Sequence, residues 1–331
     1  MSDAARDDMA QRILNQDRRA LSRAITLVES GRADHRTQAQ ALLQQLKPSG
    51  RQALRIGLSG TPGVGKSTFT EAFGLMLIEQ GLRVAVLAVD PSSARSGGSI
   101  LGDKTRMERL SRAPEAFIRP SPSQSHMGGV ARRTRDVVKL CEAAGYDVVL
   151  IETVGVGQSE TMVAQMSDLF VLLMAPAGGD ELQGVKRGIM EMADVILVNK
   201  ADGDLKPVAM RTCADYAGAL RLLRKRPQDP EGFPKALTVS AVTSDGLDSA
   251  WATLQELAQW RQDSGTQSQM RHAQDQFWFM ETVRQGLLSA LNTPQAQERT
   301  AQLKAQIAAD SLDDVSAAEQ MLTWLATQKS Q

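Results

Sequence analysis

Cysteine and long apolar runs are scarce in this sequence. Its two cysteines, Cys141 and Cys213, lie far apart and form no C-x-x-C pattern, which argues against a disulfide framework and suits a reducing compartment. No segment reaches the apolar length that crosses a bilayer, and no apolar run follows a basic start at the N-terminus. We therefore expect a cytoplasmic protein with no membrane partner.

Net charge is also absent. The 38 lysines and arginines balance the 38 aspartates and glutamates, so the composition gives no sign of a nucleic-acid or membrane-surface partner. A chain of 331 residues is long enough for one large α/β domain with a smaller addition. Function must therefore be sought in local motifs.

The most informative motif spans residues 60–67, which read GTPGVGKS and match G-x-x-x-x-G-K-[ST] in full. An apolar segment at 55–59 predicts a strand before it, and helical spacing over 67–80 predicts a helix after it. Glycines let backbone N–H groups close around phosphate oxygens, and the helix N-terminus adds partial positive charge. Lys66 would reach the terminal phosphates, and the Ser67 hydroxyl would ligate Mg²⁺. The predicted nucleotide contacts in this loop are Gly60, Gly63, Val64, Gly65, Lys66, Ser67 and Thr68.

Apolar segments and helical patterns alternate after the loop. The expected strands are residues 84–89, 148–151, 169–174, 195–198 and 237–239. Near-continuous apolar strands separated by helices predict a doubly wound, mostly parallel α/β sheet of the P-loop NTPase type. We expect an N-terminal helical extension over 1–50, a nucleotide-binding domain over 51–262 and a C-terminal helical region over 263–331.

A second motif indicates which base is bound. Asn199-Lys200-Ala201-Asp202 directly follows an expected strand, where ligands meet a doubly wound sheet, and it matches the N-K-x-D element of GTP-binding proteins. A carboxylate at Asp202 would accept hydrogen bonds from N1–H and the 2-amino group of guanine, which adenine does not present. Asn199 would brace the loop, and the stem of Lys200 would lie along the base. Ser240 and Ala241, after the next strand, are further candidates for the base loop.

Three acidic residues lie at expected strand ends or in adjoining loops. Asp90 and Glu152 each close a strand, and Asp103 follows a glycine-rich loop. Carboxylates at these places can hold Mg²⁺ and its waters and orient an attacking water. Asp90 could instead cap a turn, and Asp103 could cap a helix.

Gly155 and Gly157 follow Glu152 closely and would let the backbone approach a γ-phosphate and rearrange after its loss. No glutamine stands directly after Gly155, where small GTPases orient the attacking water. We therefore expect slow intrinsic hydrolysis unless a partner assists.

Four segments together resemble the MeaB/ArgK group of metallochaperone-type GTPases. They are residues 89–93, 97–107, 152–160 and 199–202, and the resemblance runs from about 50 to 260. It implies a GTP- and GDP-binding, Mg²⁺-dependent homodimer joined by its C-terminal helices. Such proteins dock on adenosylcobalamin-dependent acyl-CoA mutases such as methylmalonyl-CoA mutase. They gate loading of the cofactor and help remove inactivated cofactor.

The resemblance also implies roles for particular residues. Asp90, Asp103 and Glu152 match the metal and hydrolysis site of the family, and residues 178–186 resemble its additional switch. We hypothesise that Gln183 or Lys186 supplies the transition-state contact that is missing after Gly155. Because no D-x-H-x-x-G cobalamin signature is visible, we expect the partner to hold the adenosylcobalamin.

Three alternatives remain open at this point. A metal-delivery GTPase needs clustered Cys or His ligands, whereas His35, His126 and His272 are scattered. The form of this alternative that stays open is a metal shared across a dimer by Cys141. A small-molecule kinase would also use the phosphate loop, but the guanine element and the lack of a separate acceptor segment argue against it. A nucleotide-dependent binding protein with negligible turnover differs from a timing switch only in degree.

Overall fold

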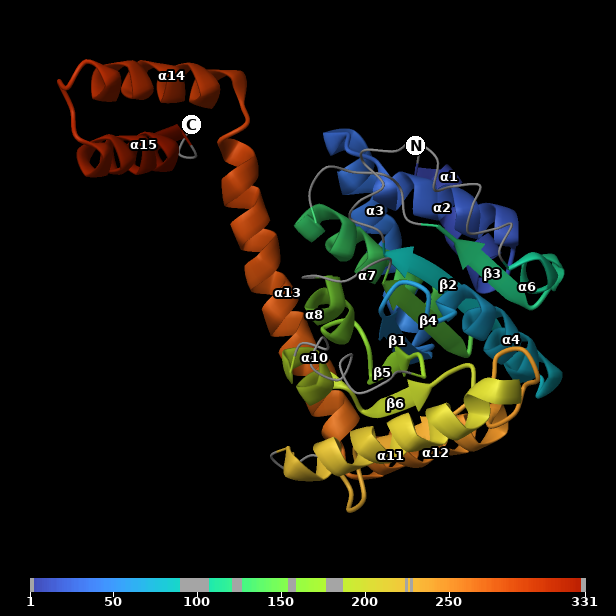
Figure 1. Ribbon diagram of the computed structural model, residues 1–331. Coiled ribbons are helices and arrows are strands. Elements are labelled where there is room, and N and C mark those ends of the chain that lie inside the picture. The colour runs from blue at the N-terminus through green and yellow to red at the C-terminus, as the bar shows by residue number, and fades with distance from the viewer. Residues whose placement is uncertain are drawn as a thin grey trace. The chain divides into compact units, whose positions relative to one another are not determined.

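The computed structural model describes residues 3–89, 107–120, 127–153, 159–176, 187–223, 226 and 229–328. A seven-stranded parallel sheet forms its core. The strands are β1 (Leu54–Gly60), β2 (Val84–Val89), β3 (Ala116–Arg119), β4 (Val148–Thr153), β5 (Leu169–Met174), β6 (Val195–Val198) and β7 (Lys235–Thr238). Their order is β3-β2-β4-β1-β5-β6-β7, and every neighbouring pair is parallel (Figure 1). The order changes direction at β1, which is where doubly wound sheets bind ligands.

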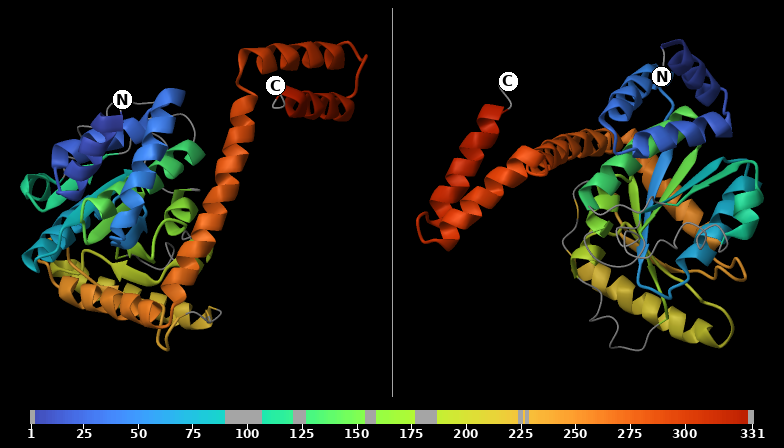
Figure 2. Two further views of the ribbon diagram at one scale, coloured as in Figure 1. Left: turned by 180° about the vertical axis from the view of Figure 1, so that it is seen from behind. Right: turned by 90° about the horizontal axis from the view of Figure 1, so that it is seen from above.

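Helices lie between these strands or after the last of them and cover both faces of the sheet (Figure 2). They are α4 (Lys66–Glu79), α6 (Glu108–Arg112), α7 (Met127–Ala143), α8 (Ser159–Ala164), α10 (Arg187–Met192), α11 (Lys206–Leu222), preceded by a 3-10 turn η2 (Gly203–Leu205), and α12 (Leu247–Asp263). No described helix is long and apolar enough to cross a membrane.

The two faces of the sheet can be told apart at β1. Ile56 and Leu58 join a buried cluster with Phe73 of α4 and Trp251 of α12, whose rings meet edge to face at 6.0 Å. Gly57, between them, points to the opposite face, where a Cβ would lie only 2.6 Å from the hydroxyl of Ser167, just after α8. Alternation along the strand thus places α4 and α12 on one face and α8 on the other.

Strand β3 was not among the predicted strands. Its four residues are short for a strand signal, and Pro114 and Pro120 flank it, which reads as loop in the sequence. It forms because Ala116 to Arg119 pair in parallel with Val84 to Leu87 of β2. The remaining strands lie where the apolar segments predicted them, with ends shifted by at most a few residues.

The N-terminal residues fold into three helices and a 3-10 turn, α1 (Asp3–Leu14), α2 (Arg18–Glu29), α3 (Ala33–Leu46) and η1 (Lys47–Ser49). Asp17 caps α2 by accepting hydrogen bonds from the N–H groups of Arg19 and Ala20 at 2.7 and 3.1 Å. These helices pack on one another and on α7. The predicted helical extension before the sheet is therefore present.

The chain divides into two compact units, with the boundary between Gln274 and Asp275 inside helix α13 (Thr266–Ala290). In the second unit α14 (Pro294–Ala308) and α15 (Asp314–Gln328) lie side by side and bury Ala296, Leu303 and Ala317. Asp313 caps α15 through a 2.9 Å bond from the N–H of Ser316.

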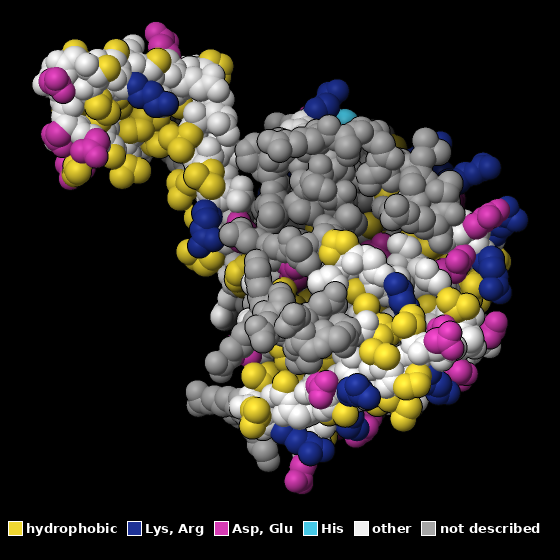
Figure 3. Space-filling model, in the orientation of Figure 1, with side chains coloured by type: hydrophobic (Ala, Val, Ile, Leu, Met, Phe, Trp, Pro, Cys, Tyr) yellow, Lys and Arg dark blue, Asp and Glu magenta, His cyan; other side chains and the backbone are white. Residues whose placement is uncertain are grey.

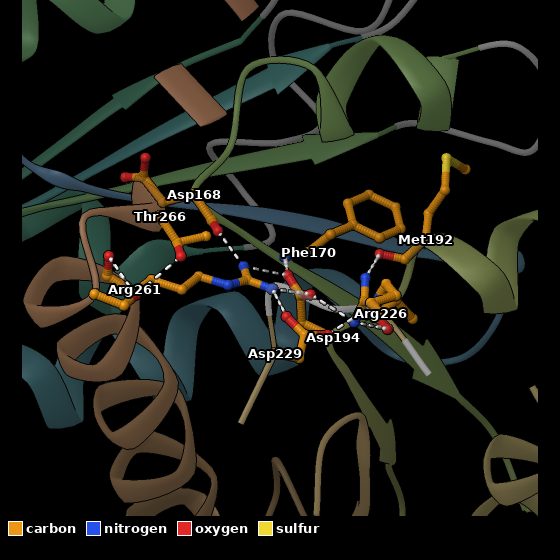
Figure 4. A network of polar contacts seen from close by, with 10 residues as sticks. Asp168, Phe170, Met192, Asp194, Arg226, Asp229, Arg261 and Thr266 are labelled. Carbon is orange, nitrogen blue, oxygen red and sulfur yellow. Dashed lines mark hydrogen bonds and ion pairs between the residues drawn. The ribbon is translucent and has the colours of Figure 1, made fainter. Parts of the chain in front are cut away.

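A buried network of charged side chains closes the amino end of the sheet (Figure 4). Asp194, just before β6, accepts from Arg261 of α12 at 2.6 and 3.1 Å and from Arg226 at 2.9 Å. Arg261 also bonds Asp229 at 2.7 Å and the carbonyl oxygen of Asp168 at 2.6 Å. These contacts fasten α12 to the strands from the side opposite the phosphate loop.

Candidate nucleotide-binding site

The phosphate loop runs from the carboxyl end of β1 into α4 through glycines that the backbone requires. A Cβ on Gly60 would lie 2.4 Å from the carbonyl oxygen of Leu173 in β5. Gly65 has a φ of 86°, and a Cβ there would lie 2.9 Å from Nδ2 of Asn199. Val64, between the two turns, is buried and anchors the loop. The loop is thus held tightly while its backbone N–H groups and the start of α4 remain in position for an anion.

Lys66 stands at the first position of α4 with its cation turned back over the loop. Its Nζ donates to the carbonyl oxygen of Gly60 at 2.5 Å and lies 3.5 Å from that of Thr61. Burial lowers the pKa of Lys66, while the charges of Glu152 and Glu160 act in the opposite direction. A half-buried cation that rests on carbonyl dipoles is a suitable partner for a phosphate group.

Glu152 lies buried at the carboxyl end of β4, beside the start of α4. Its Oε2 accepts a 3.1 Å hydrogen bond from the hydroxyl of Thr70, one turn beyond Ser67. The predicted residues Lys66, Ser67 and Glu152 therefore come together around the first turn of α4. Hydroxyl and carboxylate oxygens are the ligands that Mg²⁺ prefers, so this donor set fits the predicted metal. Among the described residues, no group of three or more His, Cys, Asp or Glu side chains is arranged to hold a metal ion.

Asn199 ties the guanine element to the phosphate loop. Its Nδ2 donates to the carbonyl oxygen of Val64 at 2.9 Å, and its Oδ1 accepts from the N–H of Ala241 at 3.1 Å. Lys200, at a φ of 59°, donates from Nζ to the carbonyl oxygen of Gly63 at 2.7 Å. Through these contacts Asn199 braces the phosphate loop and also joins it to the loop that follows β7.

Asp202 is held by the loop that follows β7. The buried hydroxyl of Ser240 donates to its Oδ2 and in turn accepts from the N–H of Thr243 at 3.1 Å. No described residue bonds the other oxygen, Oδ1, and the side chain is half exposed. One carboxylate oxygen is fixed by the protein while the other can accept from a base.

Two buried residues near the loop were not predicted from the sequence. Thr70 positions Glu152, and Glu160, at the start of α8, lies fully buried within electrostatic range of Lys66. The helical spacing from Ser67 could have suggested Thr70, but nothing in the sequence marks Glu160 as buried. Other predicted site residues lie outside the described residues, namely Asp90, Asp103, Gly155, Gln183 and Lys186.

Comparison with known proteins decides the family. The model of the "Methylmalonyl Co-A mutase-associated GTPase MeaB" family matches residues 21–296. The chain belongs to the MeaB family. A putative GTPase of Caulobacter vibrioides is 53% identical over 290 residues, 88% of each chain, and GTPase ArgK of Escherichia coli is 46% identical over 291 residues, 88% of this chain and 87% of that one. The crystal structure of an LAO/AO transport system kinase superposes with a TM-score of 0.76 at 36% identity, over 98% of this chain and 99% of that one.

Family membership confirms the central sequence prediction. This MeaB-family chain is a GTPase with a P-loop fold, and the fold binds guanine nucleotide. The description of the family states that its members are associated with methylmalonyl-CoA mutase.

Proposed function

We propose that this GTPase gates the loading of adenosylcobalamin onto an acyl-CoA mutase of the methylmalonyl-CoA mutase type and helps to protect and reactivate it. The observation that carries the proposal is the match of residues 21–296 to a mutase-associated GTPase family, joined to a phosphate loop and a guanine element that meet in one site. In this proposal the mutase holds the adenosylcobalamin, and the cytoplasm is the place of action.

We propose Ser67, Asp90, Asp103 and Glu152 as the residues that hold Mg²⁺. The hydroxyl of Ser67 and the buried carboxylate of Glu152 support this assignment by their place at the first turn of α4. When bound, Mg²⁺ would neutralise charge on the β- and γ-phosphates. Lys66 would bind the same phosphates from the other side, and the backbone of Gly155 would approach the γ-phosphate.

Slow intrinsic hydrolysis is the second part of the proposal. Val156 stands directly after Gly155, so the chain has no glutamine at that position to orient the attacking water. We propose that docking of the mutase brings Gln183 or Lys186 to the transition state. If Gln183→Ala and Lys186→Ala each leave mutase-stimulated hydrolysis unchanged while the complex still forms, this assignment is wrong.

The primary test is the rate of GTP hydrolysis by the purified chain, alone and with an adenosylcobalamin-dependent mutase from the same source. ATP serves as the control for base selectivity. Slow GTP-selective turnover that the mutase accelerates is the expected result. Turnover that no mutase changes would favour another client, such as an apoenzyme that receives a metal.

We also propose that residues 263–331 join two copies of the chain, beside an N-terminal extension over 1–50 and a GTPase domain over 51–262. Met280, Val283 and Leu287 follow one face of α13, Leu291 comes directly after it, and all four are exposed. Figure 3 shows hydrophobic side chains gathered along these terminal helices. Exposed apolar faces of this kind mark interfaces. Sedimentation should give a dimer that Leu287→Glu dissociates, whereas a monomeric wild-type chain would contradict the proposal.

A further inference from the structure

A cavity of about 390 Å³ lies along the outer side of β3. Arg18 and Ser22 of α2 form one wall, Ser111 of α6 forms part of another, and residues 117–120 form the floor. Successive side chains of a strand point to opposite faces of the sheet. A cavity that contacts four successive residues must therefore face the strand from its edge. We call this cavity the β3 groove.

The edge that the β3 groove exposes has backbone groups to which no described residue bonds. β3 is the last strand of the sheet, and the N–H of Val84 in β2 donates to the carbonyl oxygen of Glu115 at 3.1 Å. In a parallel ladder alternate residues face the same neighbour, so the backbone of Phe117 faces β2 and that of Ile118 faces away. No described residue bonds the N–H or the carbonyl oxygen of Ile118. The neighbouring outward N–H, that of Ala116, is occupied by the carbonyl oxygen of Ala113 at 3.2 Å.

Arg18 gives the β3 groove a positive charge. Its Nη1 lies 3.5 Å from the carbonyl oxygens of Ala113 and Pro114, at the outer limit for hydrogen bonds, and it forms no ion pair with a described carboxylate. Arg119, by contrast, is held by both carboxylate oxygens of Glu29. Within the described part of the chain, the groove therefore combines a cation without an ion pair with an N–H and a carbonyl oxygen that have no partner.

We propose that the β3 groove binds an extended segment of the client mutase, which adds to β3 as a further strand and places a carboxylate on Arg18. A small anion would satisfy Arg18 alone, whereas a peptide backbone also satisfies the N–H and the carbonyl oxygen of Ile118. Pro114 and Pro120 limit pairing to the centre of the strand, which protects the edge against unspecific association. The inference rests on the proposed function, because the mutase is the partner named there.

The β3 groove lies on the same sheet as the predicted metal site, so docking there can be coupled to the bound nucleotide. β3 pairs with β2, whose last residue, Val89, directly precedes Asp90 of the predicted metal site. A strand added to β3 would therefore be separated from β4 and its Glu152 by two strands, β3 and β2. Docking at this edge is close enough to bias the site without covering it.

The test is the affinity of the mutase for the full chain loaded with a non-hydrolysable GTP analogue. Ile118→Pro removes the outward N–H together with a side chain that packs on the core, and Arg18→Glu reverses the charge. Each should raise the Kd about tenfold, the effect of one lost charge contact or hydrogen bond at an interface. The matched controls are Ile118→Val, which keeps the N–H, and Arg19→Glu, which reverses an exposed charge outside the groove. Both controls should bind as the wild type does.

The outcomes separate the two proposals. A wild-type chain that does not bind the mutase overturns the proposed function and this inference together. Wild-type binding that Ile118→Pro and Arg18→Glu leave unchanged overturns the inference alone, and a loss confined to Arg18→Glu overturns strand addition. If Ile118→Pro no longer binds GTP and so fails as a folded variant, hydrogen exchange decides. The amide of Ile118 should become protected when the mutase binds the wild-type chain, and unchanged exchange would refute strand addition.

Discussion

Charged side chains are arranged differently at the two ends of the central sheet. At the amino end, Asp194 and Asp229 are nearly inaccessible and each is matched by Arg261 and Arg226. At the carboxyl end, Lys66 has no carboxylate within ion-pair distance among the described residues and rests on the carbonyl oxygen of Gly60 instead. The charges at the amino end neutralise one another within the protein, whereas the cation at the carboxyl end is placed for a negative charge that a ligand supplies.

This contrast separates stability from function along the strands. Charges that satisfy one another can be removed only at the cost of the fold, because the partner left behind stays buried. A cation held by neutral carbonyl groups keeps its attraction for an anion, and its removal breaks no ion pair among the described residues. Substitutions at the two ends should therefore have different readouts.

The largest expected effect comes from Arg261→Ala at the amino end. This change leaves Asp194 and Asp229 buried with one cation, Arg226, between them, and should lower the free energy of unfolding by about 3–5 kcal/mol. Urea denaturation measures the loss. The affinity of the remaining folded protein for GTP should not change, because the phosphate loop lies at the other end of the strands.

Lys235→Ala is the matched control for Arg261→Ala. Lys235 and Glu256 approach to 2.7 Å, as closely as Arg261 and Asp229 do, but both are solvent-accessible. The exposed pair should contribute only about 0–1 kcal/mol. Equal losses from the two substitutions would show that burial does not set the value of the network.

Lys66→Met tests the carboxyl end and should give the next largest effect. Without the cation on the terminal phosphates, GTP hydrolysis should fall by about a hundredfold to a thousandfold, the usual cost of one transition-state donor. The nucleotide-free protein should lose no stability, since burial already disfavours the charged form. A variant that keeps more than a tenth of the activity, or that unfolds, would contradict the proposed division of roles.

Asp202→Asn should affect base selection more than overall activity. The carboxylate oxygen that is not held by Ser240 would accept from guanine, and an amide there weakens these charge-assisted bonds. GTP affinity should fall about tenfold to a hundredfold. Xanthosine triphosphate, whose 2-oxo group accepts a hydrogen bond, should bind the variant better than the wild type. Competition binding with both nucleotides would show an unchanged preference if Asp202 does not read the base.

The sequence predicts the carboxyl end of the sheet better than the amino end, for a physical reason. The phosphate loop and the guanine element are continuous motifs, because each wraps a ligand group with adjacent residues. The network around Arg261 joins residues at 168, 194, 226, 229 and 261, which no local spacing connects. Only the order of strands brings them together. β3 was missed for a related reason, since pairing with β2 defines it rather than its own four residues.

The smallest expected effect is the pH dependence of the contribution that Lys66 makes to the free energy of unfolding. Burial lowers the pKa of Lys66 below its ordinary value of 10.5 in the nucleotide-free protein. Between the lowered pKa and 10.5 the unfolded chain binds a proton that the folded chain has released, so Lys66 makes stability rise with pH in that window. Below the lowered pKa both the folded and the unfolded chain bind this proton, so Lys66 lowers the free energy of unfolding by a constant amount.

The difference in unfolding free energy between the wild type and Lys66→Met isolates this contribution, because the other titrating groups cancel. It should shift in favour of the wild type as the pH rises through the alkaline range and become level above 10.5. Bound GTP places negative charge beside Lys66, which favours the cation and should flatten or reverse the slope. Parallel curves with and without nucleotide would mean that the phosphates do not meet Lys66, and the contrast between the two ends of the sheet would then fail at its functional end.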